Sequence, residues 1–73
     1  MNERLSDRLL VIRKAHGLTQ EQAGKRAGMT ARSILNYEAG TRTPSLHALQ
    51  RLAKTYGVDV GVLAALDVPR RGK

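Results

Sequence analysis

Residues 19–37 read TQEQAGKRAGMTARSILNY and contain the capping residues and glycines from which the architecture of the chain is predicted. Thr19 can cap a helix, and Gln22, three residues on, can return the bond as a capping box, so the first backbone donors of that helix find local partners. Gly28 supplies the left-handed conformation that ends the helix, and Thr30 can cap a second one. The stretch therefore predicts two short helices that meet at a tight corner.

The apolar residues of the same stretch predict how these two helices pack. Ala23 and Ala27 fall on one face of the first helix, and Ile34 and Tyr37 form the apolar face of the second. Gly24 lies inside the first helix, where glycine costs roughly 1 kcal/mol relative to alanine. We therefore expect a close approach of the second helix at Gly24, as in a helix-turn-helix.

A longer stretch, GLTQEQAGKRAGMTARSILNYEAGTRTPS, resembles the DNA-binding domain of Cro and phage-repressor type bacterial regulators, the XRE family. The resemblance covers residues 5–66 approximately. The features that agree in order are the opening Gly-Leu-Thr-Gln, then Gly28, Ile34, Tyr37-Glu38, Gly40, Arg42 and Pro44. The resemblance implies a lambda-repressor-like, five-helix bundle with its helix-turn-helix at residues 19–38.

Apolar residues outside the motif also follow helical spacing. They are Leu5, Leu9 and Ile12 in a helix over about residues 2–15; Leu46, Leu49, Leu52, Ala53 and Tyr56 in a fourth helix; and Val60, Leu63 and Leu66 in a short fifth one. Gly17 and Gly57 end the first and fourth helices, and Asp59 can cap the fifth. No stretch alternates as a strand does. We predict an all-α domain at residues 1–68, followed by a basic flexible tail at 69–73.

Length and composition limit what the chain can be. Its 73 residues suffice for one small domain, and cysteine is absent. The net charge of +7 and the pI of about 10.9 favour a polyanionic partner, of which nucleic acid is the first candidate. The first ten residues carry charges where a secretory segment would be apolar, and no apolar run reaches the roughly 18 residues of a membrane span. We therefore expect a soluble cytoplasmic protein with no membrane partner, in a bacterial or phage setting and associated with the nucleoid.

Helix-turn-helix geometry selects the residues that would meet bases. The second helix of such a motif lies in the major groove, and the first helix crosses the DNA backbone. The predicted base contacts are the exposed positions of the second helix, namely Ala31, Arg32, Ser33, Leu35 and Asn36. Arg32 can donate two hydrogen bonds to guanine O6 and N7, and Asn36 can pair with adenine N6 and N7. Ala31 and Leu35 have methyl groups suited to the thymine methyl, and Ser33 can serve a base or a phosphate.

Other residues are predicted to hold phosphates. Gln20 begins the first helix of the motif, where free N–H groups and the positive helix end favour an anion. The resemblance implies that Gln20 binds a phosphate and that Thr41, Arg42 and Thr43 grip the sugar-phosphate backbone. In an arbitrary domain exposed arginines are simply solvated, and position alone does not decide the contact of Ser33, Leu35 or Asn36. Thr30 is better explained as a cap than as a DNA contact.

Glu38 calls for a structural explanation. A carboxylate near the carboxyl end of a helix opposes the helix dipole and needs compensation. Arg13 is the predicted partner, because the resembling domains commonly pair these two positions. We interpret Arg13 and Glu38 as a structural ion pair.

Nothing in the sequence indicates catalysis or a bound small molecule. The chain has no thiol, no paired carboxylates on one helical face, no glycine-rich phosphate loop after a strand and no metal-ligand spacing around His16 or His47. We predict a protein that is not an enzyme, with no cofactor, no metal site and no small-molecule ligand.

A single helix-turn-helix reads only a few base pairs, so we expect a homodimer on half-sites roughly 34 Å apart. The first and fifth predicted helices have more apolar residues than one buried face requires, and these extra residues predict the dimer surface. Its residues are Leu10, Val11, Val62 and Ala65, with Ala64 and Val68 beside them. The alternative is that these side chains merely cover the core of a small domain.

Together these features predict a sequence-specific, double-stranded DNA-binding transcriptional regulator. It would be a small Cro-like repressor that reads the major groove with the helix starting near Thr30. One alternative is an antitoxin-like or accessory protein-interaction module for which DNA binding is secondary. Another is an RNA-binding domain, against which stands the assignment of Tyr37 and Tyr56 to the core, since no aromatic is then free to stack on bases.

Overall fold

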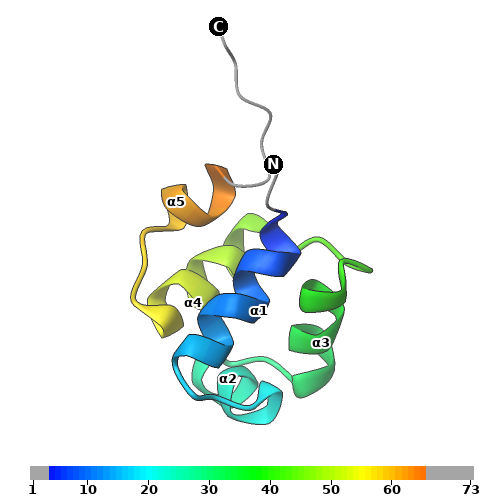
Figure 1. Ribbon diagram of the computed structural model, residues 1–73. Helices are drawn as coiled ribbons and strands as arrows, with labels where there is room; N and C mark the ends of the chain where they lie inside the picture. The colour runs from blue at the N-terminus through cyan, green and yellow to red at the C-terminus, as the bar shows by residue number, and fades with distance from the viewer. Residues whose placement is uncertain (1–3, 66–73) are drawn as a thin grey trace, which may run out of the picture.

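The computed structural model describes residues 4–65, which form five helices and no strand (Figure 1). The helices are α1 (Leu5–Ala15), α2 (Gln20–Ala27), α3 (Ala31–Ala39), α4 (Leu46–Tyr56) and α5 (Val60–Ala65). The all-α, five-helix prediction is confirmed. The predicted basic tail at residues 69–73 lies outside the described residues.

The first helix begins later than predicted. Arg4 is extended, with φ −79° and ψ 155°, and α1 starts at Leu5 rather than near residue 2. Leu5 is the first of the described residues whose side chain is buried in the core, and this burial holds the first turn of α1. Arg4 also makes no side-chain cap to the helix end.

A single core joins all five helices. Each helix contributes at least one side chain that is at most 2% exposed, for example Leu9 of α1, Ala23 of α2, Ile34 of α3, Leu52 of α4 and Leu63 of α5. α2 packs against both α3 and α4, and α1 packs against α3 and α5. As a result α3 and α4 lie on different sides of the domain, with α1 and α2 between them (Figure 1).

Some predicted core positions lie elsewhere. Leu46, the first residue of α4, is 66% exposed, although it has the helical spacing of the buried residues Leu49 and Ala53. Tyr37 and Val60 are half-buried and pack on the edge of the core. Leu66 lies outside the described residues.

Candidate nucleic-acid interface

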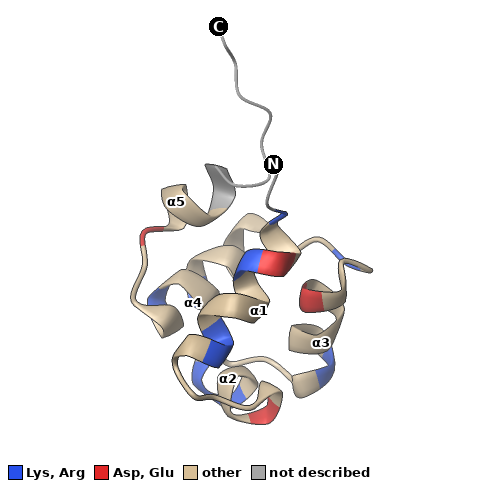
Figure 2. Cartoon of the chain, in the orientation of Figure 1, with Lys and Arg blue, Asp and Glu red and all other residues tan. Residues whose placement is uncertain are grey.

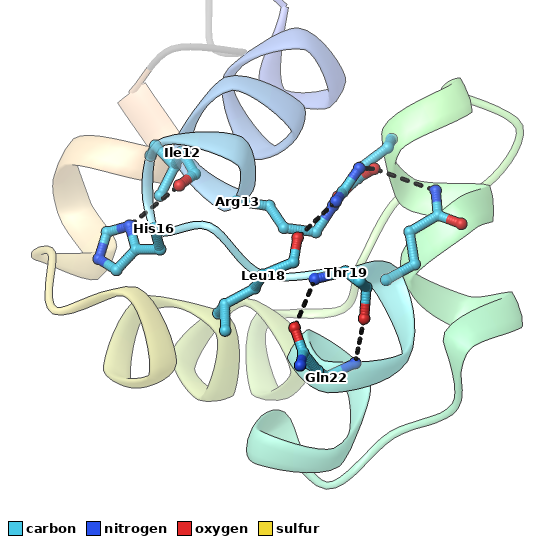
Figure 3. Close-up of polar contacts among 8 residues, drawn as sticks. Ile12, Arg13, His16, Leu18, Thr19 and Gln22 are labelled. Atoms are coloured by element: carbon cyan, nitrogen blue, oxygen red, sulfur yellow. Dashed lines mark hydrogen bonds and ion pairs between the residues drawn. The ribbon is translucent and has the colours of Figure 1, made fainter.

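The amino-terminal end of α2 is capped by the side chains of Thr19 and Gln22. The backbone N–H of Gln22 donates to Thr19 Oγ1 at 3.0 Å, and the backbone N–H of Thr19 donates to Gln22 Oε1 at 2.9 Å (Figure 3). The predicted capping box is therefore present. It orients the first turn of α2, which carries Gln20.

Gly24 allows the turn after α2 to pack closely on the helix. A β-carbon at Gly24 would lie 2.8 Å from the carbonyl oxygen of Met29 and 3.0 Å from the carbonyl carbon of Thr30. The prediction of a close approach is correct, but the partner is wrong. The backbone of the turn, rather than the body of α3, occupies the space that a side chain would need.

The start of α3 is capped by Thr30. Thr30 Oγ1 accepts from the backbone N–H of Ser33 at 3.1 Å and donates to the Ser33 hydroxyl at the same distance. Thr30 thus serves as the predicted cap. Because the Ser33 hydroxyl already accepts this bond, its lone pairs are less available to a second donor than those of a free serine.

The predicted base-contacting residues form the outer side of α3. Arg32 and Leu35 are exposed, whereas Ile34 between them is 2% exposed and holds the helix in the core. Ala31, Ser33 and Asn36 are half-buried. Arg32 makes no hydrogen bond or ion pair within residues 4–65, so its guanidinium is free to meet a ligand.

The loop after α3 is tied to Asn36. The backbone carbonyl of Asn36 accepts from the backbone N–H groups of Thr41 at 3.1 Å and Arg42 at 3.3 Å. The Thr41 hydroxyl lies 3.3 Å from both this carbonyl and Asn36 Oδ1. Thr41, Arg42 and Thr43, the predicted phosphate contacts, are all exposed beside the end of α3.

A buried ion pair joins α1 to the carboxyl-terminal part of α3. Arg13 Nε donates to Glu38 Oε2 at 2.7 Å, and Arg13 Nη2 donates to Glu38 Oε1 at 3.0 Å. A third bond runs from Arg13 Nη1 to the carbonyl of Leu18 at 2.7 Å (Figure 3). The two side chains are only 10% and 4% exposed. The hydrogen bond with Glu38 raises the pKa of Arg13, although burial opposes the shift.

Gln20 joins this pair. Its amide Nε2 donates to Glu38 Oε1 at 3.2 Å, which leaves one amide hydrogen for a ligand. Sequence reasoning predicted Gln20 as a phosphate contact but missed its bond to Glu38. No local sequence pattern indicates this bond, because Gln20 and Glu38 lie 18 positions apart and on different helices.

Two further arginines were also missed as neighbours of the motif. Arg4 lines a shallow hollow with Tyr37 and Arg42, next to the loop after α3. Arg51 of α4 donates from Nη1 to the carbonyl of Gly28 at 3.2 Å and thereby caps the carboxyl end of α2. No local pattern marks either residue, because each acts across the tertiary structure.

The residues of the predicted dimer surface lie on two packed helices. Val11 of α1 is 53% exposed and Val62 of α5 is 50% exposed, while Leu10 is half-buried. α1 and α5 contact each other. The side chain of Ala65 lies outside the described part of the chain, as does Val68.

The described part of the chain has neither a cluster of metal ligands nor a membrane-spanning helix. Within residues 4–65 no three or more His, Cys, Asp or Glu side chains gather to hold a metal ion. No helix in the same range is long and apolar enough to cross a membrane. His16 and His47 are exposed, and the His16 ring lies 5.8 Å from the ring of Tyr56.

A family model described as helix-turn-helix matches residues 9–63 of this chain. This match covers α2, α3, α4 and most of α1 and α5. The chain therefore belongs to this helix-turn-helix family, as the resemblance of residues 17–45 implied.

Individual relatives agree with this assignment. The chain is similar to the uncharacterised HTH-type transcriptional regulator YobD of Bacillus subtilis, with 41% identity over 81% of this chain. It is also similar to the cryptic phage CTXphi transcriptional repressor RstR of Vibrio cholerae, with 33% identity over 82% of this chain. The chain spans about half the length of these two relatives, 53% and 54% respectively.

A solved structure supports the fold. The P22 c2 repressor protein, determined in complex with a synthetic operator, is similar to this chain with a TM-score of 0.81. The two share 22% identity, and the similarity covers 85% of this chain and 94% of the repressor chain. The lambda-repressor-like fold is confirmed.

Proposed function

We propose that this protein is a sequence-specific, double-stranded DNA-binding transcriptional regulator of the small repressor kind. The observation that carries the proposal is the form of α3. Its inner side is anchored by Ile34, while its outer side presents Arg32, whose guanidinium has no partner within residues 4–65. The relative RstR is named a transcriptional repressor, and the P22 c2 repressor was solved with an operator.

The residues of α3 have distinct proposed roles in the major groove. Arg32 donates two hydrogen bonds to a guanine, and Asn36 pairs with an adenine. Ala31 and Leu35 contact thymine methyl groups, and Ser33 makes a lesser contact because its hydroxyl also accepts from Thr30. These contacts would carry the sequence preference.

Phosphate contacts flank the helix at both ends. Gln20 holds one phosphate with its remaining amide hydrogen, at the positive end of α2. Thr41, Arg42 and Thr43 hold the backbone on the other side. Since such contacts position the protein without reading sequence, they would supply affinity to all duplexes alike.

The active form on DNA is a homodimer in this proposal. Val11 and Val62 are large apolar residues, each at least half exposed, on helices that pack together. Leu10 and Ala65 complete the proposed surface. The protein would act in the cytoplasm of a bacterium or of a phage-infected cell, associated with the nucleoid, and its role requires no catalysis or cofactor.

Selection of binding sites from random duplex DNA tests the function, followed by a salt titration on the best site. A palindromic motif with half-sites about 34 Å apart is expected.

Arg32→Ala should remove the preference for that site and largely keep non-specific binding. Arg42→Ala should weaken binding to every sequence and reduce the salt slope by about one unit. Equal binding of all duplexes by the wild type would reject sequence-specific recognition.

Sedimentation of the DNA-free protein tests the dimer surface. Val62→Asp should shift a wild-type dimer to monomer, because it places a charge on the apolar surface. Leu46→Asp is the matched control, since Leu46 is equally apolar and 66% exposed but lies at the start of α4. A wild-type monomer at high concentration would reject dimerisation in the absence of DNA.

A further inference from the structure

A second cationic surface lies on the side of the domain that carries α4. The last turn of α2 contributes Lys25 and Arg26, and α4 contributes Arg51 and Lys54; all four are exposed. We call these four residues the α4 basic face. Its α4 residues lie away from the outer side of α3, because α3 and α4 are on different sides of the domain (Figure 2), although Arg51 also reaches the carbonyl of Gly28 at the end of α2.

The positive charge of this face is not neutralised within the protein. Lys25, Arg26 and Lys54 make no side-chain hydrogen bond or ion pair within residues 4–65. Between Glu21 and Asp59 the sequence has a single acidic residue, Glu38. That carboxylate is already bound by Arg13 in the interior.

The two α4 residues of this face lie on one side of the helix, because Arg51 and Lys54 stand at i and i+3. Arg51 is held in place, because Nη1 donates to the carbonyls of Ala27 and Gly28 and Nε lies 3.2 Å from His47 Nε2. These contacts also bring the α4 residues beside the last turn of α2.

We propose that the α4 basic face binds the phosphate backbone of a second DNA duplex while α3 occupies the first. Arg51 and Lys54 are separated by about 4.5 Å along the axis of α4. Phosphates of one strand repeat about every 3.4 Å along the duplex axis, so these two cations can face neighbouring phosphates.

The composition of the face favours DNA over a protein partner. Protein interfaces are depleted in lysine and centre on apolar and aromatic residues, whereas lysine and arginine are the usual phosphate contacts. The exposed apolar residues Val11 and Val62 belong to α1 and α5, and Leu46 lies at a different angle around α4. The inference rests on the proposed function, since it assumes that α3 holds the first duplex.

Capture of one duplex by another tests this inference. The protein is first saturated with an immobilised duplex that carries its selected site, and a labelled duplex of unrelated sequence is then added at low salt. The wild type should retain the labelled duplex. Arg26→Gln/Lys54→Gln should lose most of this capture, and the salt slope for the labelled duplex should fall by about two units. The same variant should keep its affinity for the immobilised site.

Arg42→Gln is the control on the opposite side of the domain. It should weaken binding to the immobilised site, and each protein molecule that stays bound should still capture the labelled duplex. Absence of capture by the wild type would overturn the inference. Capture that is unchanged in Arg26→Gln/Lys54→Gln would also overturn it, because the bridge would then come from two recognition helices of a dimer.

Two other outcomes are distinguishable. Retention of labelled polyglutamate but not of the second duplex would assign the face to an acidic protein and overturn the DNA assignment. Failure of the wild type to select any site would reject the proposed function alone. The α4 basic face is then tested with two unrelated duplexes, where Arg26→Gln/Lys54→Gln must still reduce bridging.

Discussion

The two junctions of α3 with its neighbours are held by different means. At the α2–α3 junction the contacts are local in sequence: the Thr30 cap and the approach of the Met29 carbonyl to Gly24. At the α1–α3 junction a buried ion pair joins Arg13 and Glu38, which are 25 residues apart. The first junction shapes the corner of the motif, and the second positions α3 against the rest of the domain.

The difference between these junctions is also energetic. A cap or a short turn contributes about 1 kcal/mol, and its loss affects one helix end. A buried charge that loses its partner has no water to replace it, so the loss is larger. The α1–α3 junction should therefore be the more sensitive of the two, although fewer residues compose it.

Removal of one charge of the buried pair should have the largest effect. Arg13→Met leaves Glu38 buried and unpaired, and should lower the free energy of unfolding by about 3–5 kcal/mol in urea denaturation. The double variant Arg13→Met/Glu38→Leu should recover most of that loss, because no charge then remains buried. Additive losses in the double variant would contradict the pairing.

Adding a side chain at Gly24 should have the second-largest effect on stability, and this variant tests the α2–α3 junction. Gly24→Ala places a methyl group 2.8 Å from the Met29 carbonyl oxygen, so it should lower the free energy of unfolding by about 1–3 kcal/mol. Gly61→Ala in α5 is the control, since the nearest atom to its new methyl group is Asp59 Oδ1 at 3.7 Å. If both variants had equal stability, the close packing at Gly24 would be unimportant.

The capping box should give a smaller effect. Thr19→Ala removes the acceptor of the Gln22 N–H bond and should lower the free energy of unfolding by about 1 kcal/mol. Thr19→Ser keeps a hydroxyl at the same place and should retain most of the stability. An equal loss in both variants would mean that the threonine methyl group, rather than the hydrogen bond, stabilises α2.

Tyr56 should affect stability only in alkaline solution. Burial, followed by the charge of Glu38, raises its pKa to about 12, against about 10 in the unfolded chain. The folded state therefore binds the proton more tightly, and this contribution to the free energy of unfolding, complete below pH 10, is lost as pH rises toward 12. Denaturation curves across this range should show the fall in the wild type, and Tyr56→Phe should lack that component.

Local patterns made much of the fold predictable. Thr19, Gln22 and Gly28 mark the ends of α2 because a cap depends on residues within one turn of each other. The outer side of α3 follows from the burial of Ile34 and from helical periodicity. The Arg13–Glu38 pair was predictable only with the help of a family resemblance, since nothing local links the two residues.

Other features could not be predicted from patterns within the chain. Leu46 has the helical spacing of a core residue, but spacing does not reveal where the neighbouring helices end, and the side chain is exposed. Gln20 sits at a helix start that suits an anion, but its bond to Glu38 depends on how α2 packs beside α3. The same holds for Arg51, which reaches the end of α2 from another helix.

Caps, left-handed glycines and apolar periodicity act over one or two turns, so the amino-acid sequence predicts the five helices, most of their ends and the exposed residues of α3. Which helices become neighbours depends instead on how they pack together. That choice buried the Arg13–Glu38 pair, attached Gln20 to it and gathered the α4 basic face on the side away from α3. The reason is that packing brings together residues far apart in the chain, and the burial that results sets the strength of their charge interactions.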